Sequence, residues 1–176
     1  LGPVAIPAWR ELLLDQRLDE RMRERAANQL SILGPQAIPV LNAALADSNG
    51  KTRARAGEAL RRLFSDLPKL GPEVLPVLED GVTHPNEIVR HAATDALLRY
   101  DPQNVAAYLF VLRRGSVAYR NGALWNLGRL QKNPELVVPA LVSALDDEEA
   151  PLRESAAEAL GKFGPEAATA VPALVK

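Results

Sequence analysis

The chain has 176 residues, of which 47% are apolar, 24% are charged and 5% are aromatic. This composition is typical of a folded protein with enough apolar side chains to build a core. Twenty-one Lys and Arg side chains oppose 22 Asp and Glu side chains, which leaves a net charge of -1. Overall charge therefore does not direct the chain to nucleic acid or to an anionic membrane. The absence of cysteine excludes disulfides, thiol catalysis and thiolate metal sites, and no apolar stretch approaches the roughly 18 residues of a membrane span.

A four-residue pattern recurs along the whole chain. An arginine is followed by alanine three residues later, by leucine seven residues later, and by leucine or an aromatic residue ten residues later. The arginines that begin the five copies are Arg23, Arg53, Arg90, Arg120 and Arg153. These offsets fall on one face of a helix with 3.6 residues per turn. Each copy therefore predicts a helix with one buried face.

A second pattern precedes each arginine and predicts a further helix. An apolar residue followed by proline, as in Ile38-Pro39 and Val138-Pro139, recurs in all repeats but the fourth, which has Val105-Ala106 there. We expect the proline to bend this first helix, because proline removes a backbone N–H. A helical hairpin of this length cannot cover its own apolar face, so neighbouring hairpins must stack. The sequence predicts an all-α array of eleven main helices.

The predicted repeats form one domain over residues 1–176. Their approximate boundaries are 1–32, 33–69, 70–100, 101–130, 131–163 and a partial repeat at 164–176. Because half a repeat follows residue 163, we expect the chain to be a segment of a longer array, with self-association through uncapped ends as the alternative. No feature of the sequence assigns a cellular compartment, although a cytoplasmic one is favoured.

Two segments carry a family resemblance: LGPQAIPVLNAALADSNGKTRARAGEALRRL (33–63) and VVPALVSALDDEEAPLRESAAEALGKFGPEA (137–167). They resemble HEAT repeats, in particular the short bacterial kind grouped with phycobilisome-lyase HEAT-like repeats. This resemblance implies a right-handed αα-superhelix, or solenoid, of about five and a half repeats, whose second helices line the concave face. It also implies an armadillo-like scaffold that binds other proteins, because such repeats serve as scaffolds in many settings.

The family also has an aspartate between the two helices and an arginine six residues later, which link adjacent repeats in a ladder. The residues that the resemblance assigns to this ladder are Asp47, Arg53, Arg90, Arg120, Asp147 and Arg153. Repeats 3 and 4 have His84 and Arg114 in the aspartate position. We therefore expect the ladder to be interrupted around residues 84–120.

The face of each second helix opposite its buried stripe is expected to be exposed, and Trp125 is unusual on it. The equivalent residues of the other repeats are Asn, Glu, Asp and Glu. An exposed tryptophan is a typical anchor of protein interfaces, and the alternative is that Trp125 packs on a neighbouring helix. The predicted partner-binding residues are Trp125, His91, Asp95, Leu98, Asn121, Glu154 and Glu158.

A row of basic residues lies near this face. Its members are Arg62, Arg99, Arg129 and Lys162. We expect the row to pair with the acidic residues of the neighbouring column, or else to be a solvated helix edge.

These features predict a non-catalytic scaffold or adaptor that binds a protein or peptide on the face of the second helices. We expect no catalytic residue, cofactor or metal site, because no Ser–His–Asp set, phosphate loop or metal-ligand spacing stands out. One alternative is a nucleic-acid-binding helical-repeat protein of the alkylation-repair type, with Trp125 beside Asp95 or Glu158. Acidic residues on the same face disfavour it. Another alternative is an accessory protein similar to a chromophore lyase.

Overall fold

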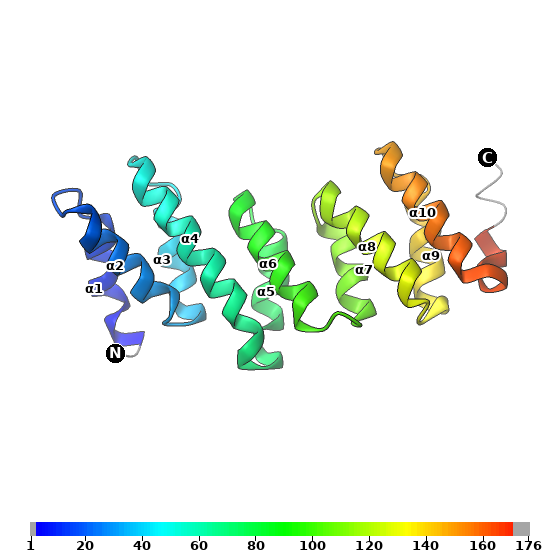
Figure 1. Ribbon diagram of the computed structural model, residues 1–176, viewed down its shortest axis with the longest axis horizontal. Coiled ribbons are helices and arrows are strands. Elements are labelled where there is room, and N and C mark those ends of the chain that lie inside the picture. Colours follow the sequence, from blue (N-terminus) through cyan, green and yellow to red (C-terminus); the bar gives the residue numbers. More distant parts are fainter. Residues whose placement is uncertain (1–2, 171–176) are drawn as a thin grey trace. The chain divides into compact units, whose positions relative to one another are not determined.

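The structure is a computed structural model that describes residues 3–170 (Figure 1). Within this range it contains ten α-helices and five short 3-10 helices, and no strand. This confirms the predicted all-α fold. The eleventh predicted helix begins in a 3-10 segment, η5 (Gly164–Ala170), and its remainder, residues 171–176, lies outside the described residues.

The ten helices form five hairpins, one in each predicted full repeat (Figure 1). The first helices of the hairpins are α1 (Ile6–Leu14), α3 (Ile38–Ala44), α5 (Leu75–Val82), α7 (Val105–Arg114) and α9 (Pro134–Ala144). The second helices are α2 (Glu20–Ser31), α4 (Gly50–Asp66), α6 (Glu87–Tyr100), α8 (Val117–Leu130) and α10 (Ala150–Phe163). Further 3-10 turns are η1 (Pro3–Ala5), η2 (Pro35–Ala37), η3 (Leu67–Leu70) and η4 (Pro72–Val74).

The inner prolines start helices in the first three repeats, where they were expected to bend them. Pro7, Pro39 and Pro76 lie in the first two positions of α1, α3 and α5, directly after the 3-10 turns η1, η2 and η4. Proline is tolerated there because the first N–H groups of a helix have no intrahelical acceptor. Pro139 alone is found inside an α-helix, within α9, among the described residues.

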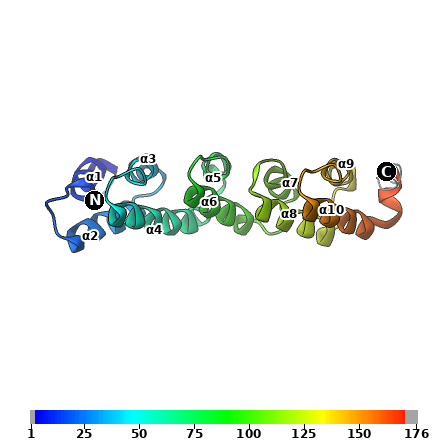
Figure 2. The ribbon, with the colours of Figure 1, turned by 90° about the horizontal axis from the view of Figure 1, so that it is seen from above.

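The chain divides into two compact units, residues 1–99 and 100–176. Within each unit the first helices form one layer and the second helices form another (Figure 2). In the N-terminal unit the buried layer between them consists mainly of leucines together with Phe64, which is 1% exposed. Its largest fully buried side chains include Leu13, Leu30, Leu41, Leu60, Leu63, Phe64, Leu78 and Leu97.

Small residues allow the helices of the N-terminal unit to approach closely. Ala93 of α6 is fully buried and lies against Gly81 of α5, where a Cβ on residue 81 would come within 2.5 Å of the Ala93 Cβ. A Cβ on Gly57 of α4 would come within 3.1 Å of Ile88 Cδ1. The alanine at this position of the pattern therefore packs within its own hairpin, whereas Gly57 brings two successive repeats together.

The C-terminal unit shows the same dependence on small residues. Ala123 and Leu127 of α8 are fully buried. Gly128 is buried, because α8 packs directly on α10 there. A Cβ on residue 128 would come within 2.9 Å of the Ala159 Cα.

Tyr108 of α7 is also buried in the C-terminal unit. Its hydroxyl donates to the Pro102 carbonyl at 3.2 Å. Burial raises the pKa of this phenol.

Enlarging the buried alanines should destabilise the fold. We expect Ala93→Leu and Ala123→Leu each to lower the free energy of unfolding by about 1–3 kcal/mol, because both sites are fully buried and have no space for three further carbons. Urea denaturation followed by circular dichroism measures this loss. The matched control is Ala54→Leu, which adds the same atoms at an exposed site and should change little. Equal losses at buried and exposed sites would contradict the helical register.

Replacing each of two glycines of α8 by alanine should change the free energy of unfolding in opposite directions. Gly128→Ala should lower the free energy of unfolding by about 1–3 kcal/mol, because the new methyl group would meet the Ala159 backbone. Gly122→Ala should raise it by up to about 1 kcal/mol, because a Cβ there has nothing within 4 Å and alanine favours the helix. Thermal melts of the two variants distinguish these cases. Stabilisation by Gly128→Ala would contradict the close approach of α8 and α10.

Candidate functional site

The ladder arginines hold the turn of their own repeat. Arg53 Nη1 donates to the carbonyl oxygens of Asp47 at 2.8 Å and Ser48 at 2.9 Å. Arg90 and Arg153 make the same pair of bonds to the turns that precede them, at 2.6–3.0 Å. Charge-assisted bonds satisfy carbonyls that lie between helices and have no other regular acceptor role. These arginines therefore fix the angle at which each second helix leaves its turn.

The aspartates link one repeat to the next. Asp147 Oδ1 accepts from the Glu149 N–H at 3.0 Å, and its other oxygen pairs with Arg120 of the preceding repeat. Both side chains of this pair are largely buried, with 24% of Arg120 and 14% of Asp147 exposed. Repeat 4 was expected to interrupt the ladder, but its arginine makes this direct link within the C-terminal unit.

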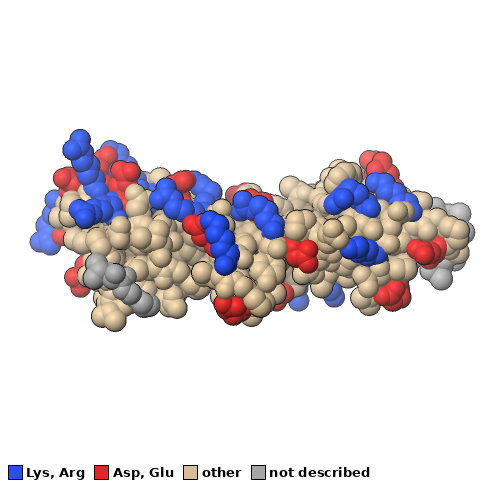
Figure 3. Space-filling view, turned by 60° about the horizontal axis from the view of Figure 1, so that its bottom comes forward, with Lys and Arg blue, Asp and Glu red and all other residues tan. Residues whose placement is uncertain are grey.

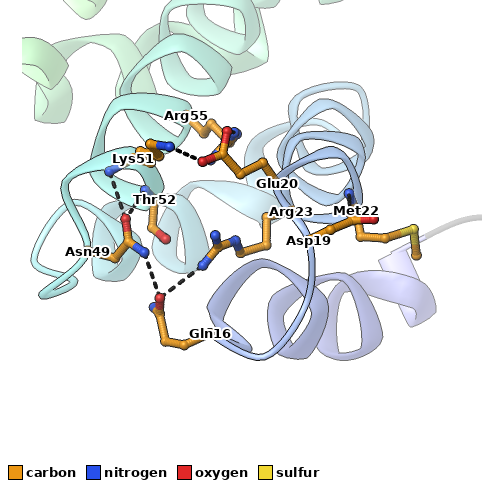
Figure 4. Close-up of polar contacts among 9 residues, drawn as sticks. All are labelled: Gln16, Asp19, Glu20, Met22, Arg23, Asn49, Lys51, Thr52 and Arg55. Atoms are coloured by element: carbon orange, nitrogen blue, oxygen red, sulfur yellow. Dashed lines mark hydrogen bonds and ion pairs between the residues drawn. The ribbon is translucent and has the colours of Figure 1, made fainter.

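Between the first two repeats a glutamine provides the link (Figure 4). Gln16 Oε1 accepts from Arg23 Nη1 at 2.9 Å and from Asn49 Nδ2 at 2.7 Å, and Gln16 Nε2 donates to Asp47 Oδ1 at 3.1 Å. Beside this network Glu20 of α2 pairs with two cations of α4, Lys51 and Arg55. The Lys51 ammonium, with a smaller effect from Arg55, lowers the pKa of the Glu20 carboxyl. The network joins α2 to α4 and has a structural role.

His84 takes the place of the aspartate in the third repeat. Its Nδ1 accepts from the Asn86 N–H at 3.1 Å, as an aspartate oxygen does in the other turns. Its Nε2 lies 3.2 Å from Asn42 Nδ2 in the preceding repeat, and the tautomer of the ring decides the donor and acceptor roles in this contact. A histidine therefore makes the link that was expected to be absent.

The predicted partner-binding residues fall into two groups. In the N-terminal unit α6 carries His91, Asp95 and Leu98. His91 and Leu98 are half-buried, Asp95 is exposed, and His91 Nε2 lies 3.6 Å from Glu87 Oε1. A shallow cavity of about 180 Å³ borders His91 and Asp95. No group of three or more metal-ligating side chains is found in residues 3–170.

The second group lies on α8 and α10 of the C-terminal unit and is centred on Trp125. The indole is 55% exposed, although the adjacent Leu124 is fully buried. Two cations lie over the ring: the Arg129 guanidinium carbon is 5.5 Å and the Lys162 ammonium is 5.9 Å from its centroid. Trp125 therefore contacts a neighbouring helix through Lys162 and keeps more than half of its surface open to solvent.

The local sequence explains this arrangement. Arg129 follows Trp125 by four residues, so both lie on one face of α8. Lys162 reaches the ring from α10, which lies close to α8 at Gly128: a Cβ at residue 128 would come within 2.9 Å of Ala159 Cα and 3.4 Å of Lys162 Cδ. The close packing of α8 on α10 and the cation–π contacts thus depend on the same glycine.

We define the Trp125 surface by the exposed residues around this indole. Its members are Asn121, Trp125, Arg129, Glu154, Glu158 and Lys162. Asn121 Oδ1 accepts from Ser155 Oγ at 2.6 Å, which joins α8 to α10 at the edge of the surface. The roles of Arg129 and Lys162 were missed, because the basic row was expected to pair with acidic residues. On the face drawn in Figure 3, Lys and Arg side chains are interspersed with Asp and Glu.

A groove between α7 and α9 was also missed. It has a volume of about 480 Å³ and lies on the first-helix side of the C-terminal unit. The residues that line it are Leu109, Leu112, Arg113, Leu136, Pro139, Ala140, Ser143, Ala144 and Asp147. Leu136 is 57% exposed beside it. Periodicity alone placed these residues in two separate helices and not around one groove.

Comparison with known families identifies the repeats. A model of HEAT repeats matches residues 105–176, and a model of the PBS lyase HEAT-like repeat matches residues 22–47. The chain is a HEAT repeat protein. This confirms the resemblance found in the sequence. No helix in the described part of this HEAT repeat protein is long and apolar enough to cross a membrane.

Three solved structures match this HEAT repeat protein at low sequence identity. An engineered protein is 20% identical, with a TM-score of 0.36, and the match covers 97% of this chain and 83% of that one. The complex of CpcE and CpcF of phycocyanin lyase from Nostoc sp. PCC7120 is 22% identical, with a TM-score of 0.38 and coverages of 89% and 98%. The N-terminal domain of MAST/Orbit is 18% identical, with a TM-score of 0.47 and coverages of 95% and 87%. No curated protein matches the chain.

The role of His84 in the ladder can be tested by substitution. His84→Ala removes the acceptor of the Asn86 N–H and the link to Asn42, so the free energy of unfolding should fall by about 0.5–1.5 kcal/mol. His84→Asp keeps an acceptor at the turn and should cost less. Chemical denaturation of both variants measures the difference. If alanine is tolerated as well as aspartate, the turn does not depend on this side chain.

Proposed function

We propose that this HEAT repeat protein is a non-catalytic scaffold or adaptor that binds a protein or peptide on the second helices of its C-terminal unit. The observation that carries the proposal is the exposed indole of Trp125, with 55% of its surface open. Exposing a large aromatic side chain to water is unfavourable. When a partner covers the exposed part of the indole, burial of this apolar surface favours binding. Tryptophan is among the residues that dominate binding energies at interfaces.

The geometry around Trp125 supports binding. Arg129 and Lys162 contact the ring from two helices, which reduces the side-chain freedom that the indole loses when a partner binds. Stacked hairpins bury only the faces that meet their neighbours, which leaves a broad lateral surface on the second helices. HEAT repeats typically bind proteins.

The chemistry of the Trp125 surface supports a binding role and not a catalytic one. Its side chains are one indole, one amide, two carboxylates and two cations. Asn121 is bonded to Ser155, and the two cations lie over the indole. None of these contacts is the nucleophile–base pair that activates a hydroxyl or thiol.

Substitution of Trp125 tests the proposal with two measurements. Trp125→Ala should lower the free energy of unfolding by less than about 1 kcal/mol, since exposed cation–π contacts contribute little. Leu124→Ala, at the adjacent and fully buried position, should cost about 2–5 kcal/mol. Peptides selected from a random phage-displayed library on the unmodified chain should bind the Trp125→Ala variant at least tenfold more weakly, about 1.4 kcal/mol.

Two results would contradict the proposal. A loss of stability as large as that of Leu124→Ala would mean that Trp125 is a packing residue. Selected peptides that bind the Trp125→Ala variant with unchanged affinity would mean that partners use another surface.

A further inference from the structure

The two cations on Trp125 have no carboxylate partner in the part of the chain that the structure describes. Lys162 follows Glu158 by four residues on α10, a spacing that favours an ion pair, yet its ammonium lies over the indole. Besides lying over the indole, the Arg129 guanidinium makes a long hydrogen bond, 3.4 Å, to Asn126 Oδ1. Both side chains are exposed, so their remaining N–H donors face solvent.

These cations restrict the chemistry of a partner. The Trp125 ring already has two positive groups within 6 Å of its centroid. A lysine or arginine of a partner would have to displace one of them before it could stack on the ring, and it would be repelled on approach. A carboxylate of a partner is attracted instead, because guanidinium and ammonium groups bind it through charge-assisted hydrogen bonds.

Charge changes sign along the Trp125 surface. Arg129 and Lys162 lie in the last turns of α8 and α10, whereas Glu154 and Glu158 lie earlier on α10 and are exposed. A long polyanion such as a nucleic-acid strand would pass over both carboxylates and be repelled. A short acidic element fits the basic end without reaching the acidic one.

There is also room for an apolar side chain beside the ring. Gly122 precedes Trp125 by three residues, so it lies on the same face of α8. A Cβ at residue 122 would meet nothing within 4 Å. The Trp125 side chain also lies beyond 4 Å of this Cβ, so an open position lies one turn before the indole on the same face of α8. An apolar side chain of a partner can be placed there.

We propose that the partner of the Trp125 surface is a peptide segment in which Asp or Glu lies next to an apolar or aromatic residue. The carboxylate pairs with Arg129 and Lys162, and the apolar side chain packs against the indole above Gly122. This inference rests on the proposed function, because it names the chemistry of the partner at the same surface. Unlike the proposed function, this inference predicts that binding depends on the negative charge of the partner, and this dependence can be measured separately.

The test uses the full chain and three fluorescein-labelled peptides of equal length with a central Leu-Phe pair. The flanking residues are Glu in the first peptide, Gln in the second and Lys in the third. Fluorescence anisotropy should show that the Glu peptide binds at least tenfold more tightly than the Gln peptide and that the Lys peptide binds most weakly. Binding of the Glu peptide should weaken as salt is raised, because both cations are exposed to solvent.

Variants assign the charge effect to the two cations. Arg129→Gln and Lys162→Gln should each weaken binding of the Glu peptide several-fold and leave binding of the Gln peptide unchanged. Arg113→Gln is the matched control, since it removes the same charge from an exposed position of α7 in the same unit. It should not alter binding. Thermal melts of all three variants show whether the fold is kept.

The outcomes separate this inference from the proposed function. If the Glu and Gln peptides bind equally and neither binds the Trp125→Ala variant, the inference of an acidic partner is wrong. The proposed binding role of Trp125 is then kept. If the Glu peptide binds equally to Trp125→Ala and to the unmodified chain, both are wrong. No binding of the Glu peptide at about 1 mM, or tighter binding of an oligothymidylate strand, also overturns the acidic-peptide partner.

Discussion

The structure depends on how closely one helix can approach the next. In the N-terminal unit Ala93 lies against Gly81, and in the C-terminal unit Gly128 lies against the backbone of Ala159. At each contact a single added methyl group would come within 3 Å of the facing atoms. Close approach lets leucines from both layers fill the space between helices at the density of a protein interior. Small residues therefore allow close packing both within a hairpin and between successive hairpins, and the larger side chains fill the remaining space.

Polar links then fix the order and angle of the hairpins. In each of three repeats an arginine holds the carbonyls of the turn before it, so the second helix leaves its turn in a defined direction. The link to the neighbouring repeat varies in chemistry but keeps its place in the fold. Gln16, His84 and the Arg120–Asp147 pair each make it once. A repeat array tolerates different side chains in these links, because each link needs only one donor and one acceptor at equivalent positions of neighbouring repeats.

The same close approach creates the candidate binding surface. Gly128 lets α10 approach α8, and Lys162 of α10 lies over the Trp125 ring of α8. Packing that buries Leu124 and Leu127 thus also positions an indole and two cations on the outside of the same helices. Stability and the proposed recognition therefore share one contact, and a substitution at Gly128 would disturb both.

The sequence by itself determined the helices, their pairing into hairpins, the buried alanines and the helix face on which Trp125 lies. Each of these follows from the spacing of residues along one helix, because 3.6 residues per turn assigns every side chain to a face. The tertiary structure alone decided that Lys162 lies on Trp125, that Gly128 is buried, that His84 contacts Asn42 of the preceding repeat and that a groove lies between α7 and α9. These features join residues of different helices, and their distances depend on how far apart the helices stack. Helical periodicity contains no information about that separation, which is determined by the small residues at the contacts between helices.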